Sequence, residues 1–252
     1  QNKTVLVRSL ETGEEESLPY DKLVIATGAD PIEPPLPGVG LKNVLRLKSL
    51  EDAEIFKSVL NNEACPYVAI VGGGLIGMEM TEALIECGRG VTVIEMMPHI
   101  LAMLDDNIAL QVERHLEQLG IKVMTNTRVE EILGNEEGEV VGVRTSAGEV
   151  PAELVLLSVG IKPNVKLARD AGLVIGPSGA IHVNQYMQTS DLNIFAAGDC
   201  AEKSCFIQGT QCVLPLGSVA NKEGRVAGSN ATGNIERFPG IAGATSVKVF
   251  DW

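Results

Sequence analysis

The chain has 252 residues, 45% hydrophobic and 4% aromatic, with 27 glycines and a formal net charge of −13. This composition favours an α/β protein in one large or two small domains. No basic stripe points to nucleic acid, and no run approaches the roughly 18 apolar residues of a membrane span. Five cysteines are too few for a secreted disulfide scaffold of this length, so we expect a reduced, cytoplasmic setting.

The N-terminal part alternates strand patterns with turns. Strands are predicted over 3–8 and 23–26, with a hairpin turn at Thr12-Gly13. Residues 30–40 contain four prolines, which cannot donate ladder hydrogen bonds. We therefore expect this segment to link two domains.

Helices and strands alternate from Ser49 onward. Ser49 and Asp52 match a capping box, which predicts a helix to near Asn61. Such alternation implies a parallel sheet with right-handed connections. Strands are predicted over 67–71, 91–95 and 121–124, and helices over 75–86 and 105–119.

Three short strand runs separated by turns come next and predict an antiparallel meander, inserted as a crossover. They cover 128–133, 140–145 and 148–150, and a buried strand over 154–159 then returns to the parallel sheet. Further strands are predicted over 181–183, 193–197 and 245–252, and a helix over about 216–230.

A glycine turn separates the strand 67–71 from the helix 75–86. Gly72 permits the tight turn, Gly74 lets a pyrophosphate approach the backbone, and Gly77 lets the helix pack against the strand. The free amides at the helix start and the helix dipole favour an anion there. This context indicates a nicotinamide-dinucleotide site, whereas a purely structural glycine turn is the alternative.

Glu95 ends the next strand, eighteen residues beyond Gly77. A carboxylate at this position can bind both ribose hydroxyls of NAD and would repel the 2′-phosphate of NADP. Met96 and Met97 offer no arginine for that phosphate. The sequence therefore predicts a preference for NAD.

A second ligand-binding pattern ends at Asp199. The strand before it closes on small residues, and its acid lies at the carboxyl end, where open α/β sheets bind ligands. A plain strand followed by a turn is the alternative.

Several segments in order resemble the pyridine nucleotide-disulfide oxidoreductases. Residues 189–199 resemble the family's second flavin fingerprint, 26–28 its other flavin-domain strand end, and 160–164 the close of its NAD domain. Residues 215–225 are similar to the branch of coenzyme A-disulfide reductases, NADH oxidases and NADH peroxidases, and 246–251 to the start of its interface domain. The resemblance covers nearly the whole chain.

The resemblance implies a fold and a division into domains. The fold is α/β, with a Rossmann-like three-layer NAD-binding domain and antiparallel meander inserted in an incomplete FAD-binding domain. The implied parts are FAD-binding 1–46, NAD-binding 47–163, FAD-binding continued 164–238, and the start of an interface (dimerisation) domain 239–252.

The resemblance also implies the cofactors FAD and NAD(H) and their contacts. The residues expected at NAD are Gly72, Gly74, Ile76, Gly77, Glu79, Glu95 and Gly160. Those expected at FAD are Thr27, Gly28, Asp199, Leu216 and Ala220, with Asn221 as a substrate contact. Glu79 is expected on the first turn of its helix, near the nicotinamide. A solvated carboxylate stabilised by the helix dipole is the alternative there.

The implied reaction is hydride transfer from NADH to FAD, then to a cysteine or disulfide (such as coenzyme A disulfide) or to oxygen or peroxide. The family's redox cysteine would precede Gln1, so we expect a fragment of a homodimeric parent. We expect this fragment to show weak or absent flavin binding and no turnover, and to contain no catalytic residue. One alternative is a reductase component that passes electrons to a ferredoxin, rubredoxin or nitrite reductase. A non-catalytic NAD-sensing module is the other.

The cysteines suggest two further sites, which we set aside. Cys200 and Cys205 have the spacing of a redox disulfide, but they follow the second flavin fingerprint, and the charge of Asp199 disfavours a thiolate. A zinc site with Cys212 lacks paired C-x2-C spacing and a neighbouring histidine. We therefore predict no metal site.

Overall fold

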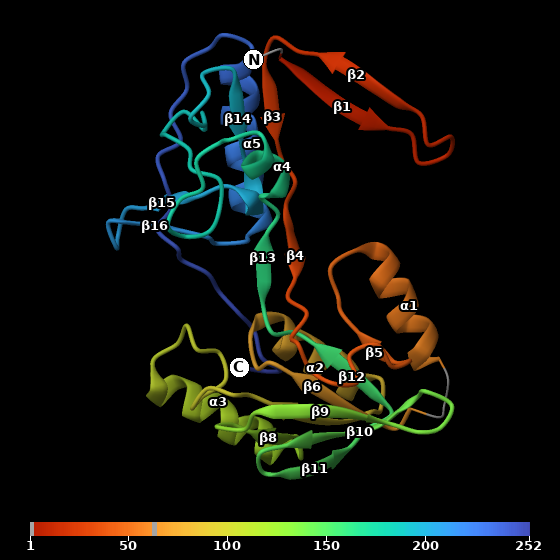
Figure 1. The fold of residues 1–252 in the computed structure, drawn as a ribbon. Coiled ribbons are helices and arrows are strands. Elements are labelled where there is room, and N and C mark those ends of the chain that lie inside the picture. The colour runs from red at the N-terminus through yellow and green to blue at the C-terminus, as the bar shows by residue number, and fades with distance from the viewer. Residues whose placement is uncertain (1–2, 62–64) are drawn as a thin grey trace. The chain divides into compact units, whose positions relative to one another are not determined.

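The computed structural model describes residues 3–61 and 65–252 (Figure 1). Gln1 lies outside the described residues, and the redox cysteine is expected before it. The chain divides into two compact units. Unit 1 comprises residues 1–30 and 163–245, and unit 2 comprises 31–162 and 246–252. The short strands β4 (Ala29–Pro31) and β13 (Ile161–Pro163) carry the chain from one unit to the other.

Unit 2 is built on a five-stranded parallel sheet with the order β5-β12-β6-β7-β8. Its strands are β5 (Val44–Leu45), β6 (Tyr67–Val71), β7 (Gly90–Ile94), β8 (Lys122–Met124) and β12 (Leu154–Leu157). The predicted parallel sheet is confirmed. The chain turns back across the sheet between β6 and β12, and open α/β sheets bind ligands at such a switch point.

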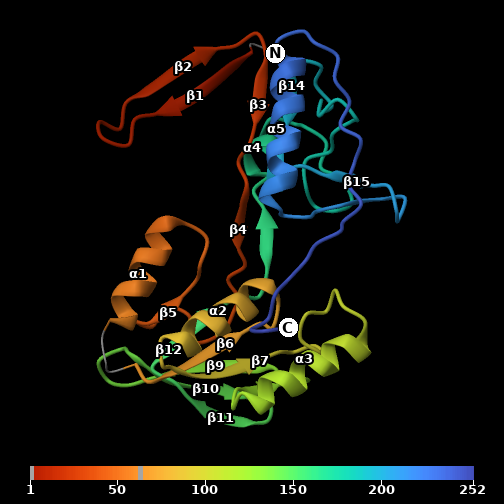
Figure 2. The same ribbon diagram turned by 180° about the vertical axis from the view of Figure 1, so that it is seen from behind.

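Both faces of this sheet are covered, which explains why β6 is hydrophobic at consecutive positions. Val68 and Ile70 pack into a core with the three helices, whereas Ala69 and Val71 pack toward an antiparallel sheet. The helices are α1 (Leu50–Leu60), α2 (Leu75–Glu86) and α3 (Asp106–Gln118), seen from the other side in Figure 2. The predicted capping box at Ser49 and Asp52 is confirmed.

The antiparallel sheet has the order β11-β10-β9. Its strands are β9 (Val129–Gly134), β10 (Val140–Thr145) and β11 (Gly148–Pro151). Each pairs antiparallel with its neighbour in the chain, so the predicted meander is confirmed.

The strand predicted over 245–252 is wrong. Residues 246–252 lie against α2 and α3 as irregular chain, where Glu82 accepts the Phe250 N–H at 3.0 Å and binds Lys248 Nζ at 3.2 Å. These two bonds hold the pKa of Glu82 below its usual value. The ring of Trp252 stacks on His115 of α3. The backbone N–H groups of a strand are bound by the carbonyls of a neighbouring strand, but here the Glu82 side chain accepts the Phe250 N–H instead.

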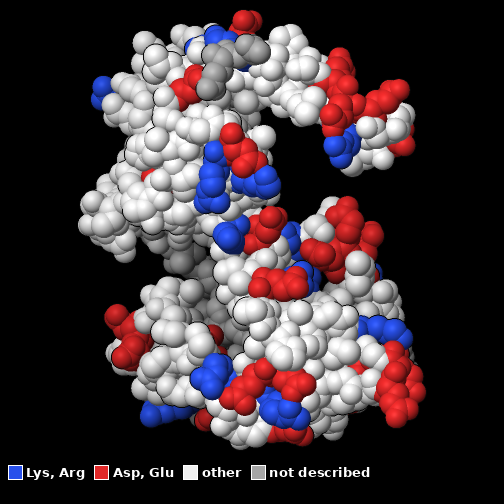
Figure 3. Space-filling model, viewed as in Figure 1, with Lys and Arg blue, Asp and Glu red and all other residues white. Residues whose placement is uncertain are grey.

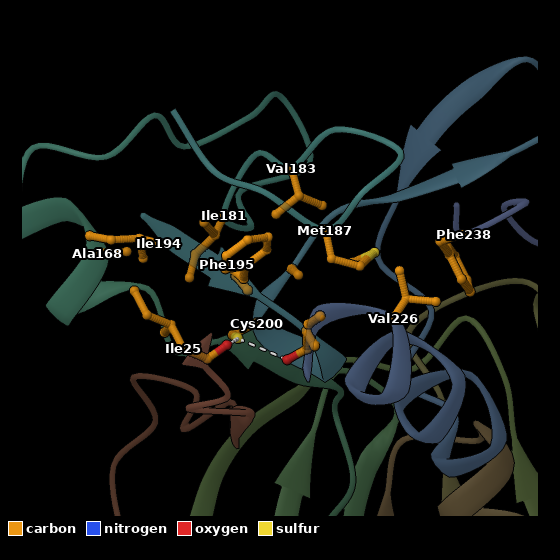
Figure 4. Close-up of a cluster of buried hydrophobic side chains, with 14 of the residues drawn as sticks. Ile25, Ala168, Ile181, Val183, Met187, Ile194, Phe195, Cys200, Val226 and Phe238 are labelled. Atoms are coloured by element: carbon orange, nitrogen blue, oxygen red, sulfur yellow. Dashed lines mark hydrogen bonds between the residues drawn. The ribbon is translucent and has the colours of Figure 1, made fainter. Parts of the chain in front are cut away.

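Unit 1 contains the parallel pair β3 (Leu23–Ile25) and β14 (Ile194–Ala196), packed against α5 (Gly217–Ala231). Figure 4 shows its core, where Ile25 and Phe195 from the strands lie among side chains of α5 and the connecting loops. The predicted hairpin is confirmed as β1 (Thr4–Arg8) and β2 (Glu15–Pro19). The remaining elements are α4 (Lys166–Asp170), the short 3-10 helix η1 (Gly198–Cys200), β15 (Lys203–Cys205) and β16 (Thr210–Cys212).

The strand predicted over 181–183 is also wrong. Ile181 forms isolated bridges to Ile175 and Ala201, on different segments. The His182 N–H bonds instead to the Val174 carbonyl at 3.0 Å. Consecutive residues thus bond in different directions, and no ladder forms.

The surface carries many carboxylates. Figure 3 shows acidic side chains over the hairpin β1–β2, where Glu14, Glu15 and Glu16 are exposed, and Lys and Arg interspersed with acids elsewhere on this face. None of the helices in the described part of the chain has the length and apolar character that crossing a bilayer requires.

Candidate functional site

The glycine turn of unit 2 lies at the carboxyl edge of the sheet, between β6 and α2. Gly72 has a φ of +107°, and a Cβ there would come within 2.5 Å of the Ser158 carbonyl oxygen. A Cβ at Gly77 would lie 2.2 Å from the Gly72 carbonyl oxygen, because α2 packs closely against the turn. At Gly74 nothing lies within 4 Å of the position of a Cβ. The backbone at Gly74 is therefore open to a bulky ligand.

The start of α2 is suited to an anion. Its N-cap residue, Gly74, makes no side-chain capping bond, so the first amides of the helix keep their donor capacity. Ile76 is 41% exposed, and Glu79 is exposed on the same helix. Glu79 lies at the start of the second helical turn, which corrects the predicted first turn: with Leu75 as the first helical residue, it is the fifth. Gly160 lies just beyond β12, at the same edge of the sheet.

Glu95 reaches back to the glycine turn. Its Oε2 accepts the Gly73 N–H at 2.7 Å and its Oε1 accepts the Met97 N–H at 2.7 Å. Each carboxylate oxygen can accept a further hydrogen bond, which ribose hydroxyls could donate. The residues present thus fit a dinucleotide with free ribose hydroxyls.

Sequence reasoning did not assign roles to Gly73 and Ser158. A Cβ at Gly73 would meet Ile100 at 2.6 Å, and Ser158 Oγ donates to the Gly72 carbonyl at 2.8 Å. The register accounts for the contact of Ser158, since Leu157 pairs with Val71, at the end of β6. Ser158 follows Leu157 in the chain and therefore lies beside the turn, whereas Ile100 is six residues beyond the end of β7 and no pairing predicts its contact with Gly73.

In unit 1 the strand ends bring the flavin candidates together. Because β3 and β14 are parallel, Thr27 and Gly28 lie at the same edge as Asp199. Thr27 Oγ1 donates to the Asn164 carbonyl at 2.6 Å, and the Asn164 N–H donates to the Gly28 carbonyl at 2.9 Å. Asp199 is half-buried within η1.

The start of α5 lies beside this edge. Its N-cap residue, Leu216, makes no side-chain capping bond, and Asn221 is exposed one turn later. A Cβ at Gly198 would lie 3.6 Å from the Cβ of Ala220, which is ordinary van der Waals contact. Unit 1 therefore brings Asp199 and the start of α5 to one place.

A buried ion pair bonds to Gly198, the residue before Asp199, and the sequence carried no local signal for it. Lys203 and Glu223 have fully buried side chains, with Nζ and Oε2 3.6 Å apart. Burial raises the pKa of Glu223, while Lys203 and the Gly198 N–H act in the opposite direction.

All five cysteines are free thiols. Cys200 is buried in the core of unit 1, its Sγ 3.3 Å from the Ala197 carbonyl and 3.6 Å from that of Ile25 (Figure 4). Burial raises the pKa of Cys65 and of Cys212. Within residues 3–61 and 65–252, no group of three or more His, Cys, Asp or Glu could hold a metal ion.

Comparison with known proteins identifies the family. Residues 1–224 match the sequence profile of the pyridine nucleotide-disulphide oxidoreductases. The chain belongs to this family. Within the family, the chain falls in the branch of coenzyme A-disulfide reductases, NADH oxidases and persulfide reductases.

Three relatives illustrate the match. An NADH oxidase of Methanocaldococcus jannaschii is 40% identical over 95% of this chain and 53% of its own length. An NAD(P)H coenzyme A polysulfide/persulfide reductase of Pyrococcus horikoshii is 42% identical over 98% and 55%. The structure of an NAD-dependent persulfide reductase from A. fulgidus is 44% identical, with a TM-score of 0.94 over 99% of this chain and 46% of that chain. This oxidoreductase chain thus spans about half the length of its curated relatives.

Proposed function

We propose that unit 2 binds NAD(H) and that unit 1 supplies part of an FAD site. The observation that carries the NAD site is the 2.7 Å hydrogen bond from the Gly73 N–H to Glu95, beside the uncapped start of α2. It brings an anion-binding helix end and a ribose-binding acid to one edge of the sheet.

The proposal assigns contacts to residues of both units. The NAD contacts are Gly72, Gly74, Ile76, Gly77, Glu79, Glu95 and Gly160, and the FAD contacts are Thr27, Gly28, Asp199, Leu216 and Ala220. In domain terms, 47–163 is a Rossmann-like NAD-binding domain inserted between two parts of an FAD-binding domain, 1–46 and 164–238. Residues 239–252 begin an interface domain.

When bound, the two cofactors supply hydride transfer, and the protein supplies position and charge. The amides at the start of α2 stabilise the negative pyrophosphate. The Glu95 carboxylate accepts hydrogen bonds from ribose hydroxyls and repels a 2′-phosphate, which favours NAD. Asp199 accepts hydrogen bonds from the ribityl hydroxyls of the flavin, beside the start of α5.

The whole protein, on this proposal, transfers hydride from NADH to FAD and then reduces a disulfide or persulfide (such as one of coenzyme A) or oxygen, with Asn221 as a substrate contact. Support comes from the relatives, which by name are NADH oxidases and an NAD(P)H coenzyme A polysulfide/persulfide reductase. We extend the proposal to a homodimer and, because the cysteines are free, to a cytoplasmic protein.

Flavin binding and turnover by the full-length protein test the proposal. We expect a flavin absorption spectrum after reconstitution with FAD. We also expect NADH oxidation that depends on added coenzyme A persulfide, coenzyme A disulfide or oxygen, with NADH bound more tightly than NADPH. A full-length protein that binds NADH but not FAD would contradict the flavoenzyme assignment and leave an NAD-sensing role.

A further inference from the structure

The Lys203–Glu223 ion pair connects the turn that carries Asp199 to α5. Lys203 Nζ donates to the carbonyls of Gly198 at 2.9 Å and Ala201 at 3.0 Å, and it lies 3.6 Å from Glu223 Oε2. Glu223, in the second turn of α5, accepts the Gly198 N–H at 2.7 Å. Both peptide groups of Gly198 are therefore held by the pair.

Gly198 sets the direction of the chain into Asp199. Its φ is +81°, in the left-handed region that glycine adopts readily, and it immediately precedes Asp199. The two charges also depend on one another: Glu223 Oε1 is buried without a hydrogen-bond partner among the described residues. Lys203 is thus the cation that compensates this carboxylate, and a buried charge left alone is strongly unfavourable.

We propose that Lys203 and Glu223 are positioning residues for the flavin, which hold Asp199 against the start of α5 in the geometry that FAD binds. This inference rests on the proposed function, because it assumes that Asp199 and α5 contact FAD. Both side chains are fully buried and bond to the backbone of Gly198, so the pair acts through the turn.

The test is FAD affinity, measured by flavin fluorescence, alongside the melting temperature of the FAD-free full-length protein. Lys203→Met and Glu223→Gln each leave one buried charge uncompensated. Each is expected to lower both the FAD affinity and the melting temperature. The double variant Lys203→Met with Glu223→Leu removes both charges and should recover the melting temperature. It should still bind FAD on the order of tenfold more weakly, because the hydrogen bonds to Gly198 remain lost.

Two further variants sharpen the test. Lys222→Met removes an exposed neighbouring charge and should leave FAD affinity unchanged. Glu223→Asp keeps the charge but withdraws the carboxylate from Gly198, so it should weaken FAD binding even if the double variant does not fold. Recovery of FAD affinity together with stability in the double variant, or unchanged affinity in Glu223→Asp, would overturn the positioning role. Absence of FAD binding by the wild-type protein would instead refute the proposed function on which this inference rests.

Discussion

The carboxylate of Glu95 lies 2.7 Å from the backbone nitrogen of Gly73, although the two residues are 22 positions apart. The pairing of β6 with β7 creates this contact, since it aligns Ile94 with Val71. The Met97 N–H holds the other oxygen at 2.7 Å. The acid is therefore fixed by backbone amides, with no need for a ligand to orient it.

Replacing Glu95 tests its proposed role in choosing the cofactor. A glutamine can accept only one of the two backbone N–H groups, because its amide nitrogen is a donor. We expect Glu95→Gln to weaken NADH binding about tenfold and to change NADPH binding less, since the repulsive charge is gone. Titrations followed by NADH fluorescence measure both. Glu86→Gln, exposed at the far end of α2, is the matched control. Equal affinity of the unsubstituted protein for both cofactors would contradict the argument.

Gly72 tests the conformation of the turn. An alanine there would adopt a φ of +107° and approach the Ser158 carbonyl to 2.5 Å. We expect Gly72→Ala to lower the free energy of unfolding by about 2–4 kcal/mol, from backbone strain and overpacking together. Gly224→Ala in α5 is the control, because nothing lies within 4 Å of its Cβ position. That change should raise stability by about 0.5–1 kcal/mol. Denaturant unfolding compares them, and similar losses in both would argue against a special turn.

The capping box of α1 predicts a pH dependence. Hydrogen bonds, first of all from the Ser49 N–H, hold the pKa of Asp52 below its ordinary value of 3.8. A carboxyl whose pKa is lower in the folded state stabilises the fold above its unfolded pKa, and this contribution is lost as the pH falls through the folded value. We expect Asp52→Asn to cost about 0.5–1 kcal/mol at neutral pH and to flatten the acid limb of stability below about pH 4. Urea unfolding of the parent and the variant at pH values above and below about 4 measures this change in the free energy of unfolding. A variant whose stability falls with acid as steeply as the parent would disprove the link, and Glu51→Gln is the control.

Thiol labelling tests the burial of the cysteines. Cys87 is exposed, whereas Cys65, Cys200 and Cys205 are buried. Burial also raises the pKa of Cys65 and of Cys212, which lowers their thiolate fraction at neutral pH. We expect Cys87 to react with a thiol reagent well before the others, as mapped by mass spectrometry. Rapid labelling of Cys200 and Cys205, or a disulfide between them under mild oxidation, would revive the redox pair that we set aside.

The sequence predicted well where a structure depends on residues close in the chain. The capping box at Ser49 and Asp52 and the strand, turn and helix around Gly72 are local patterns, since each needs partners only a few positions away. The strand predicted over 245–252 fails for the opposite reason. Its alternating residues match a strand, but Glu82 takes a backbone amide that a neighbouring strand would otherwise bind.

By itself, the sequence determined the alternation of strands and helices, the glycine turn and the order of the family's motifs, because these follow from residue types and spacing. Only the tertiary structure decided that Glu95 bonds to Gly73 and that Lys203 and Glu223 hold Gly198. Hydrogen bonds and ion pairs between distant residues depend on strand register and helix packing. A lysine and a glutamate twenty positions apart form no pattern until the fold removes both from water.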